Sequence, residues 1–477
     1  MRRLIAILAI LNLSSFSIAA PLDTTGDAVV GQPGFSTNDF NHPDGNASSS
    51  NLSLSNAAGL AVGPNGRLYV ADSDNNRVLS WASAAAFSNG AAADMVFGQP
   101  DFLSGDPNHG GVSAGSLNLP QGVWVDDANN LWVTDAFNSR VLKFNNPASD
   151  ATPTLADLVV GQPDFVSADQ NHGNGEHGTH VALADSLQFP GRVFVRGGDL
   201  WIADSGNSRV LHYPLPTANE PTADRVFGQY GDFTCRAKNN DGFGNNGSSA
   251  SADNLYNPIG MVVDSAGRLY LADYLNNRIV RFDNPLTSDT TADAVYGQPN
   301  FTSSTPNNGG LAVGLQIPID LAMDAAGRLI AADASNNRVV VYNSPLTSGA
   351  PNVVFGQLGS FLTNSPNHGL GTAATDANGL FGPTGVAVDR RHNVYISDTN
   401  NMRALRYDAP FGLPGDMNCD GLINVGDVEP WVLAVLNPSG YAASFPACDM
   451  TLGDLNGDGR IDGADVRGLV SAILGPP

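Results

Sequence analysis

The sequence has few charged side chains and little positive charge, and each shortage excludes a class of partner. Only 14% of its 477 residues are charged, and 23 basic side chains stand against 46 acidic ones, which gives a formal net charge of −23. A partner with a phosphate backbone or an anionic lipid surface requires a basic face on the protein. The composition therefore argues against nucleic acid and against anionic membrane surfaces as partners.

Long apolar runs are lacking after the first twenty residues. Arg2 and Arg3 precede an apolar stretch from Leu4 to Leu13, and small residues follow near Ala19, which is the pattern of a secretion signal. The stretch is shorter than the ~20 residues that cross a bilayer. We therefore predict a signal peptide over residues 1–20, a secreted, extracellular protein that can also lie at the cell surface, and no membrane insertion. Loss of both arginines changes the net charge from −23 to −25.

Cysteine is scarce as well, with three residues in the chain. Export makes disulfides possible. Cys419 and Cys448 lie close together in the C-terminal region and are expected to pair, which leaves Cys235 alone. We expect Cys235 to be a buried thiol rather than a reactive one.

Glycine and proline, in contrast, are abundant, at 53 and 30 residues, and they accompany an internal repeat. A segment of the form Asp-x-x-Asn-x-Arg recurs six times, with a slight shift of the asparagines in the last copy. It begins at Asp72, Asp135, Asp204, Asp273, Asp333 and Asp398. A Gly-Gln pair also recurs six times, at Gly31, Gly98, Gly161, Gly228, Gly297 and Gly356.

One repeat unit predicts four short antiparallel strands. In the second unit these are residues 120–126, 131–135, 140–144 and 158–161, separated by turn residues. Such units repeated around an axis form the blades of a propeller. The last unit ends at Tyr407 without its Gly-Gln strand, whereas a spare copy, residues 27–31, stands at the N-terminus. The sequence therefore predicts an all-β, six-bladed β-propeller over residues 21–412, in which the N-terminal strand completes the last blade and removes an open edge.

The repeat resembles that of the NHL-repeat family of six-bladed propellers. The resemblance rests on the Pro-x-Gly-Val-x-Val-Asp, Leu-Tyr-Val-Ala-Asp and Asn-x-Arg-Val pieces, clearest between Pro258 and Val280, and covers about 380 residues in six copies. The departures are Ala57 for proline, Arg196 for a strand-end aspartate and Asp320 for glycine. The resemblance implies a fold but no single function, because such propellers serve both as binding platforms and, in related forms, as enzymes.

The repeated Asp and Arg side chains, such as Asp72 and Arg77, stand at the two ends of a tight turn. We interpret them as structural ties of that turn, since every blade carries the same pair. The connections from each fourth strand to the next first strand are long and emerge on the same face as these turns. We expect this face to bind a ligand.

Four histidines stand at related places in these connections: His42, His109, His172 and His368. We interpret them as supports of the loops rather than as a ring of metal ligands, because two blades lack the residue. A separate cluster, Glu176, His177 and His180, has side chains that can bind a metal. No catalytic constellation and no cofactor-binding motif is recognised in the propeller.

The composition changes after Pro414, where two copies of a calcium-binding loop follow each other 38 residues apart. Calcium takes six to eight oxygen ligands, and Asp or Asn at alternate loop positions supplies them. Gly421 and Gly459 make the sharp turn of each loop, and a short apolar helix is expected after each. The expected ligands of two Ca²⁺ ions are Asp416, Asn418, Asp420, Leu422 (carbonyl), Asn424 and Asp427, and Asp454, Asn456, Asp458, Arg460 (carbonyl), Asp462 and Asp465.

Aspartate rather than glutamate at position 12, and single loop–helix halves, make this region similar to dockerin domains of type I with their duplicated EF-hand-type loops. The resemblance covers residues 415–475, within a C-terminal domain that we place at residues 413–477. It implies a calcium-dependent, small α-helical module that docks onto a cohesin-like protein on a scaffold or cell surface. The Cys419–Cys448 bridge would staple this small module. Loop positions 10 and 11, which usually contact the partner, are Val425-Gly426 and Gly463-Ala464 here.

These features together favour a secreted, non-catalytic binding or scaffold protein. Its propeller is expected to bind a protein, peptide or glycan, and its C-terminal module to attach it to a partner or surface. The alternative is an extracellular propeller enzyme, lyase- or lactonase-like or acting on polysaccharide, with inward-facing groups such as Asp320, His177 and His180. The sequence does not decide the ligand, the docking partner or the oligomeric state.

Overall fold

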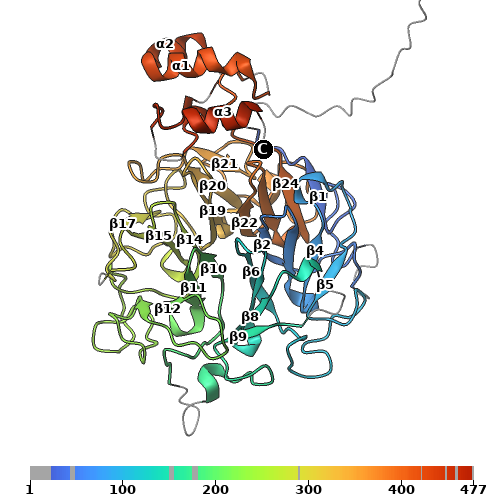
Figure 1. Cartoon of the computed structure of the whole chain (residues 1–477). Helices are drawn as coiled ribbons and strands as arrows, with labels where there is room; N and C mark the ends of the chain where they lie inside the picture. Colours follow the sequence, from blue (N-terminus) through green and yellow to red (C-terminus); the bar gives the residue numbers. More distant parts are fainter. Residues whose placement is uncertain are drawn as a thin grey trace, which may run out of the picture.

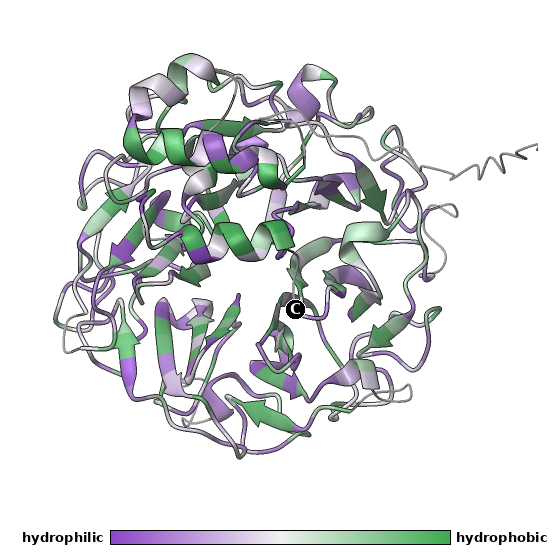
Figure 2. Ribbon diagram, turned by 45° about the horizontal axis from the view of Figure 1, so that its top comes forward, coloured by the Kyte–Doolittle hydropathy of each residue, from purple (hydrophilic) through white to green (hydrophobic). Residues whose placement is uncertain are grey.

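The computed structural model describes residues 23–42, 49–149, 155–173, 181–287, 290–419, 422–445, 448, 450–456 and 460–474. The predicted signal peptide lies outside these residues. The body of the chain forms six four-stranded antiparallel sheets arranged around an axis (Figures 1 and 2). This arrangement confirms the predicted six-bladed propeller.

Each of the first five blades is a continuous stretch of chain. Their strands are β2 (Ala57–Val62), β3 (Leu68–Asp72), β4 (Arg77–Trp81) and β5 (Met95–Phe97) in blade 1; β6 (Pro120–Val125), β7 (Leu131–Asp135), β8 (Arg140–Phe144) and β9 (Leu158–Val160) in blade 2; β10 (Val193–Arg196), β11 (Asp199–Asp204), β12 (Arg209–Pro214) and β13 (Arg225–Phe227) in blade 3; β14 (Pro258–Val263), β15 (Leu269–Asp273), β16 (Arg278–Phe282) and β17 (Ala294–Tyr296) in blade 4; and β18 (Pro318–Met323), β19 (Leu329–Asp333), β20 (Arg338–Tyr342) and β21 (Val353–Phe355) in blade 5.

Blade 6 joins the two ends of the propeller. It contains β22 (Pro383–Val388), β23 (Val394–Asp398) and β24 (Arg403–Tyr407), and its outer strand is the N-terminal β1 (Ala28–Val30). Val29 lies opposite Leu405 in this antiparallel pair. The N-terminal strand therefore closes the last blade, as the spare repeat predicted.

The recurring Gly-Gln pair ends the outer strand of every blade. The six glycines have φ between 79° and 89°, a conformation that glycine adopts without strain. A Cβ atom at Gly161 would lie 2.4 Å from a methyl carbon of Leu187. The glycine is required both by its backbone angle and by the close approach of this buried leucine.

A short 3₁₀ turn joins the second and third strands of every blade. These turns are η1 (Ser73–Asn75), η3 (Ala136–Asn138), η7 (Ser205–Asn207), η8 (Tyr274–Asn276), η9 (Ala334–Asn336) and η11 (Thr399–Asn401). Other 3₁₀ segments are η2 (Ala84–Ala86), η4 (Pro147–Ser149), η5 (Gln170–Gly173), η10 (Pro366–Gly369), η12 (Val425–Asp427) and η13 (Met450–Gly453). The repeated turns bring the aspartate and the arginine of each repeat side by side.

A small helical region follows the propeller and covers part of one of its faces (Figures 1 and 2). It contains α1 (Val428–Leu436), α2 (Pro438–Ser444) and α3 (Val466–Leu474). Its own core includes Trp431, Tyr441 and Leu469. The Trp431 indole N–H donates to the carbonyl of Gly453 at 3.0 Å and therefore ties α1 to η13.

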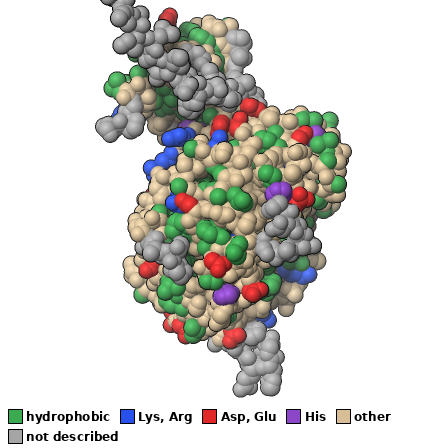
Figure 3. All heavy atoms as spheres, turned by 90° about the vertical axis from the view of Figure 1, so that its right-hand side faces the viewer, with side chains coloured by type: hydrophobic (Ala, Val, Ile, Leu, Met, Phe, Trp, Pro, Cys, Tyr) green, Lys and Arg blue, Asp and Glu red, His purple; other side chains and the backbone are tan. Residues whose placement is uncertain are grey.

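The described residues include no helix that is long and apolar enough to cross a bilayer. Figure 3 shows one side of the molecule, on which uncharged atoms predominate and acidic side chains are scattered singly. This distribution agrees with the low content of charged residues.

Candidate functional site

The axis of the propeller is lined by the third residue of each repeat unit's first-strand motif. Four blades place glycine there, at Gly59, Gly122, Gly260 and Gly385, so the backbones approach closely. The other two blades place Arg192 and Asp320 there, and these side chains form an ion pair with 3.3 Å between Nε and Oδ2.

Arg192 holds several blades together at the axis. Besides the Asp320 carboxylate of blade 5, its guanidinium donates to the carbonyls of Gln121 in blade 2 and Thr384 in blade 6, the latter at 2.7 Å. Burial raises the pKa of Asp320, while the Arg192 guanidinium acts in the opposite direction. Because a fixed cation already occupies the axis beside Asp320, this carboxylate is placed as a structural partner rather than as a metal ligand or catalytic acid. Sequence reasoning missed Arg192 because a glycine directly precedes it in the third repeat.

The six Asp–Arg pairs of the repeated turns lie fully buried. In blade 1 the Arg77 Nε lies 2.7 Å from the Asp72 Oδ2, and both side chains are 0% exposed. The arginine also donates to the carbonyls of Ser50, Ser53 and Phe102, and Asp72 Oδ1 accepts from the Ser55 N–H. Equivalent bonds occur in every blade. The pairs are therefore structural, as expected, but they tie down the long connections as well as the turn.

A second repeated contact, which the sequence analysis did not identify, is a reciprocal pair of asparagine amides in every blade. Asn138 Nδ2 donates to Asn108 Oδ1 at 2.7 Å, and Asn108 Nδ2 returns a bond of 2.9 Å. The equivalent pairs are Asn41–Asn75, Asn171–Asn207, Asn239–Asn276, Asn307–Asn336 and Asn367–Asn401. The loop member of each pair has φ between 45° and 53°, which asparagine tolerates better than most residues.

These pairs correct the interpretation of the loop histidines. The residue that supports each long connection is the asparagine directly before the histidine position, and it is present in all six blades. The histidines have different partners from blade to blade. The His368 Nε2 lies 3.0 Å from an Asp376 oxygen, whereas the His42 Nδ1 lies 3.4 Å from an Asp39 oxygen. Glu176, His177 and His180 lie outside the described residues.

A cavity of the propeller lies on the face opposite to the long connections, where the sequence led us to expect ligand binding. It has a volume of about 660 Å³ and is lined by the turns between the first and second strands of blades 2 to 5 and by the third-to-fourth-strand loop of blade 5. The long connections are instead held against the body of the protein by the arginine and asparagine bonds described above. Loop length alone therefore does not indicate which face binds a ligand.

Aromatic and aliphatic side chains form the floor of this cavity. The rings of Trp124 and Phe194 lie 4.4 Å apart between centroids, and Tyr270 and Met323 extend the apolar surface. The Trp124 indole N–H donates to the Val195 carbonyl at 2.9 Å. The tryptophan is therefore held in a fixed orientation.

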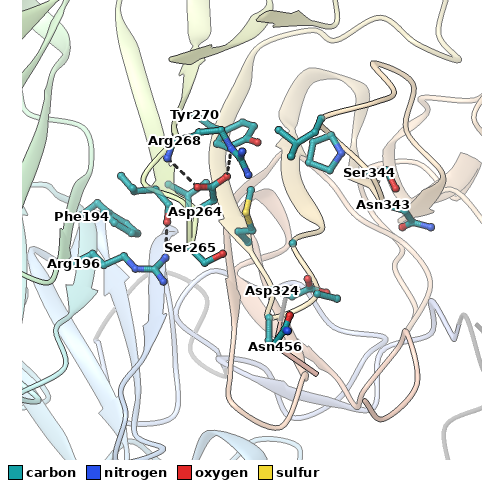
Figure 4. A pocket seen from close by; sticks show the side chains of 18 of the residues that line it. Phe194, Arg196, Asp264, Ser265, Arg268, Tyr270, Asp324, Asn343, Ser344 and Asn456 are labelled. Carbon is teal, nitrogen blue, oxygen red and sulfur yellow. Dashed lines mark hydrogen bonds and ion pairs between the residues drawn. The ribbon is translucent and has the colours of Figure 1, made fainter. Parts of the chain in front are cut away.

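Charged and polar groups form the rim (Figure 4). The Arg268 Nε lies 2.7 Å from an Asp264 oxygen, and Arg196 donates to the Val263 carbonyl at 2.9 Å. Asn343 and Ser344 line the side formed by blade 5, and Asn456 reaches the cavity from the C-terminal region. The cavity thus combines aromatic and aliphatic side chains with many hydrogen-bonding groups, which suits small molecules or short segments of larger ones.

The two loops of the C-terminal region have matching internal bonds. In the first, Asp427 Oδ1 accepts from the N–H groups of Met417 and Asn418, and Oδ2 accepts from Asn424. In the second, Asp465 does the same with Leu455, Asn456 and Asp462. Ten of the twelve expected calcium ligands lie within the described residues: Asp416, Asn418, Leu422, Asn424 and Asp427 in the first loop, and Asp454, Asn456, Arg460, Asp462 and Asp465 in the second. Asp420, Gly421, Asp458 and Gly459 lie outside the described residues.

Two of the three cysteines form a disulfide, and the third is a free thiol. Cys419 and Cys448 form a disulfide with 5.8 Å between their Cα atoms. Cys235 is free and buried, and its sulfur lies 3.2 Å from Asn240 Nδ2.

Two apolar stripes on the C-terminal helices face solvent. On α1 they comprise Val428, Val432 and Leu436, and on α3 they comprise Val466, Val470 and Leu474. Each stripe has a spacing of four residues, and the exposed fractions run from 40% to 78%. Large side chains at such spacing lie on one side of a helix, so each helix presents an uncovered apolar surface.

Comparisons with known proteins concern the propeller. The family model described as NHL repeat matches residues 54–79 and 255–282. None of the curated proteins matches the chain. Similar solved structures include a streptogramin B lyase (12% identity over 76% of this chain and 96% of that chain, TM-score 0.41), a virginiamycin B lyase from Staphylococcus aureus (12%, 74% and 94%, TM-score 0.39) and a protein of unknown function from Bacteroides thetaiotaomicron (11%, 80% and 75%, TM-score 0.44). At these identities the likenesses carry no functional information. The matched repeats and the six closed blades together identify the body of the chain as a six-bladed β-propeller that contains NHL repeats.

Proposed function

We propose that this protein is an exported binding protein whose propeller holds a segment of a protein, a peptide or a glycan in the cavity beside Trp124, Phe194 and Tyr270. The observation that carries the proposal is the cavity itself, which is lined both by aromatic and aliphatic side chains and by hydrogen-bonding groups. About 660 Å³ falls within the range of pockets that enclose ligands. The partly exposed Trp124 ring, which its hydrogen bond to Val195 fixes, supplies contact area at little cost in conformational entropy, which suits both sugar rings and apolar side chains.

The contacts of Asp320 at the propeller axis argue against the alternative of an enzyme with an axial active site. Its propeller candidate within the described residues, Asp320, is paired with Arg192 and accepts hydrogen bonds from the N–H groups of Leu321 and Val386. Binding without catalysis is therefore the function that we favour.

The test of the cavity is binding of the full chain, in calcium-containing buffer, to glycan and peptide arrays. Leu346 lines the cavity and is 49% exposed, so Leu346→Asp changes the site without changing the core. Leu103, 70% exposed, belongs to a long connection, and Leu103→Asp is the matched control. We expect array hits to disappear in the cavity variant and to persist in the control; hits that survive Leu346→Asp and vanish with Leu103→Asp would assign binding to the opposite face.

We also propose that the C-terminal region is a dockerin-like module that binds two Ca²⁺ ions. Its residues fit the cation. Asp427 and Asp465 are 0% exposed, and among the described residues no lysine or arginine forms an ion pair with either. Each carboxylate accepts three backbone N–H bonds, but its negative charge still has no positive partner among the described residues. Calcium supplies that positive charge and takes oxygen ligands of the kinds present here.

The partner of this module is proposed to be a protein, cohesin-like or on a cell surface. The stripes on α1 and α3 support this proposal, since exposed apolar surface arranged in continuous patches marks contact sites for other proteins. Val425 at loop position 10, 78% exposed, extends the apolar surface of α1. The unusual residues at positions 10 and 11 thus favour a partner with an apolar surface.

Pull-down of surface proteins with the full chain tests the docking proposal. We expect Val432→Asp with Val470→Asp to abolish capture that depends on calcium, whereas Leu103→Asp on the propeller leaves it unchanged. Capture that is equal in buffers with calcium and with chelator would contradict the proposed mode of attachment.

A further inference from the structure

A cluster outside the cavity brings together one histidine and two carboxylates at the outer edge between blades 2 and 3. One ligand atom from each of His172, Asp185 and Glu220 lies within 4.8 Å of the other two. His172 belongs to η5, and the backbone N–H of Glu220 donates to the carbonyl of Val159 in β9 at 3.4 Å. Three separate segments of the chain therefore converge at this point.

Two of these side chains present buried polar atoms without a partner. His172 Nε2 and Asp185 Oδ1 are shielded from solvent and have no hydrogen-bond partner among the described residues. Such atoms are rare in proteins, and each needs an explanation, commonly an ion or a water molecule. In contrast, His368 at the equivalent position of another blade has its Nε2 beside Asp376.

The negative charges of Asp185 and Glu220 also favour binding of a cation. Asp185 and Glu220 are two like charges at close range, and neither forms an ion pair with a lysine or arginine in the described part of the chain. Like charges held together raise the free energy of the folded state, and a divalent cation between them reverses this effect.

Glu220 occupies a backbone position that suits glycine. Its φ is 58°, in the left-handed region that glutamate seldom adopts. The first blade makes the same contact with Asn89 and Gly90: Asn89 accepts from the N–H of Val29, and Gly90 donates to the Val29 carbonyl. In blade 3 Asn219 accepts from the Val159 N–H in the same way, and Glu220 replaces the glycine.

We propose that His172, Asp185 and Glu220 form a binding site for a divalent transition-metal ion, represented by Zn²⁺. An imidazole nitrogen with two carboxylates is a ligand set that suits zinc, and three protein ligands leave a coordination position for water. Tetrahedral ligand atoms at roughly 2.1 Å from zinc lie about 3.4 Å apart. The ligand atoms here lie within 4.8 Å of one another, and a movement of the exposed Glu220 side chain would bring them to the shorter zinc-bound separation.

The test is the zinc content of the full chain after incubation with Zn²⁺ and gel filtration in a large excess of Ca²⁺, which keeps the C-terminal loops occupied by calcium. We expect one zinc per chain in the wild type. His172→Ala is expected to lose it and His368→Ala, the matched control, to keep it. Glu220→Gly is expected to lose zinc affinity by at least tenfold, because it removes a ligand while placing at this φ the residue that blade 1 carries.

Cobalt provides a second readout, since the visible absorption of Co²⁺ reports a nitrogen and oxygen ligand set with low coordination number. We expect this absorption in the wild type and its loss in Glu220→Gly. The proposal is overturned if the wild type retains no zinc, or if His172→Ala and Glu220→Gly retain it fully. Retention in these variants with loss in a His177→Ala, His180→Ala double variant would assign the metal to those histidines instead.

Discussion

Six fully buried arginine side chains hold the connections of the propeller in place. Each guanidinium has an aspartate from its own turn and carbonyl groups from the neighbouring connections as partners, as Arg278 has Asp273, Ser251 and Asn254. The net energy of such a pair is small, but removing one partner leaves a buried charge without compensation. The repeated motif therefore stabilises the fold by holding these long connections, which contain no strand of their own among the described residues, against the blades.

Asp273→Asn tests this role at one residue. We expect it to lower the free energy of unfolding by about 3–5 kcal/mol, because it leaves Arg278 buried without its counter-ion. Asp94→Asn is the control: Asp94 pairs with Arg67 but its side chain is 42% exposed, so the expected loss is below about 1 kcal/mol. Urea unfolding followed by tryptophan fluorescence measures both, and equal losses would contradict the account.

His392 makes the stability of the propeller depend on pH. Burial lowers the pKa of this imidazole below its ordinary value of 6.5, although Asp324 and Asp389 act in the opposite direction and Arg328 adds to the lowering. As the pH falls below about 6.5, the His392 imidazole becomes protonated in the unfolded chain while it is still neutral in the folded protein. The stability contributed by neutral His392 is therefore complete above this pH and is lost as the pH falls through the folded pKa.

We expect the wild type to lose up to about 1.4 kcal/mol per pH unit from this group as the pH falls below 6.5. His392→Asn should show a smaller loss. Asparagine suits this position because Asn129, with φ 62°, occupies the equivalent turn of blade 2, where His392 has φ 65°. Thermal unfolding between pH 7 and pH 5 measures the difference, and identical slopes for the two proteins would show that His392 is not the titrating group.

At the scale of the elements, the sequence predicted the blades more closely than the site. Strand alternation, the Gly-Gln copies and the spare N-terminal repeat sufficed for the order of strands and for closure by β1, because these features repeat along the chain. The sequence predicted ligand binding on the face of the long connections, whereas the cavity that carries our proposal lies on the other face. Loop length does not reveal that buried side chains such as Arg77 hold the loops. Contacts between distant repeats, such as Arg192 with Asp320, leave no local pattern and were not foreseen.

Closure by β1 gives an element-scale prediction. Val29 is 0% exposed, and Val29→Asp places a charge in the core of blade 6. We expect a loss of more than about 3 kcal/mol in unfolding free energy, because burying an unpaired charge is costly. Val313→Asp, at a site 37% exposed, is the same substitution outside the core and should cost much less. Similar unfolding midpoints for the two variants would mean that the N-terminal strand contributes little to closure.

At the scale of the whole molecule, the chain combines a six-bladed propeller with a small helical region for which we propose two calcium ions. The module has few buried apolar side chains, among them Trp431, Tyr441 and Leu469, and one disulfide. Domains of this size usually need such additional ties. The propeller, in contrast, has buried apolar side chains between every two neighbouring blades.

Chelation should therefore affect one part of the molecule only. We expect that removal of calcium makes residues 413–474 sensitive to protease while the propeller stays resistant, because metal binding and folding are coupled in the small module. Limited proteolysis with mass spectrometry, with and without chelator, measures this. Cleavage patterns that do not change on chelation would contradict calcium-dependent folding.

The location of the ligand is the central claim, and hydrogen–deuterium exchange of the full chain with and without an array hit tests it most directly. We predict slower exchange in the segments that line the cavity, residues 124–127, 194–196, 262–270 and 323–327, with no change in the long connections at 103–118 and 234–255. Protection confined to those long connections, with the cavity segments unchanged, would contradict the account and return the binding site to the opposite face.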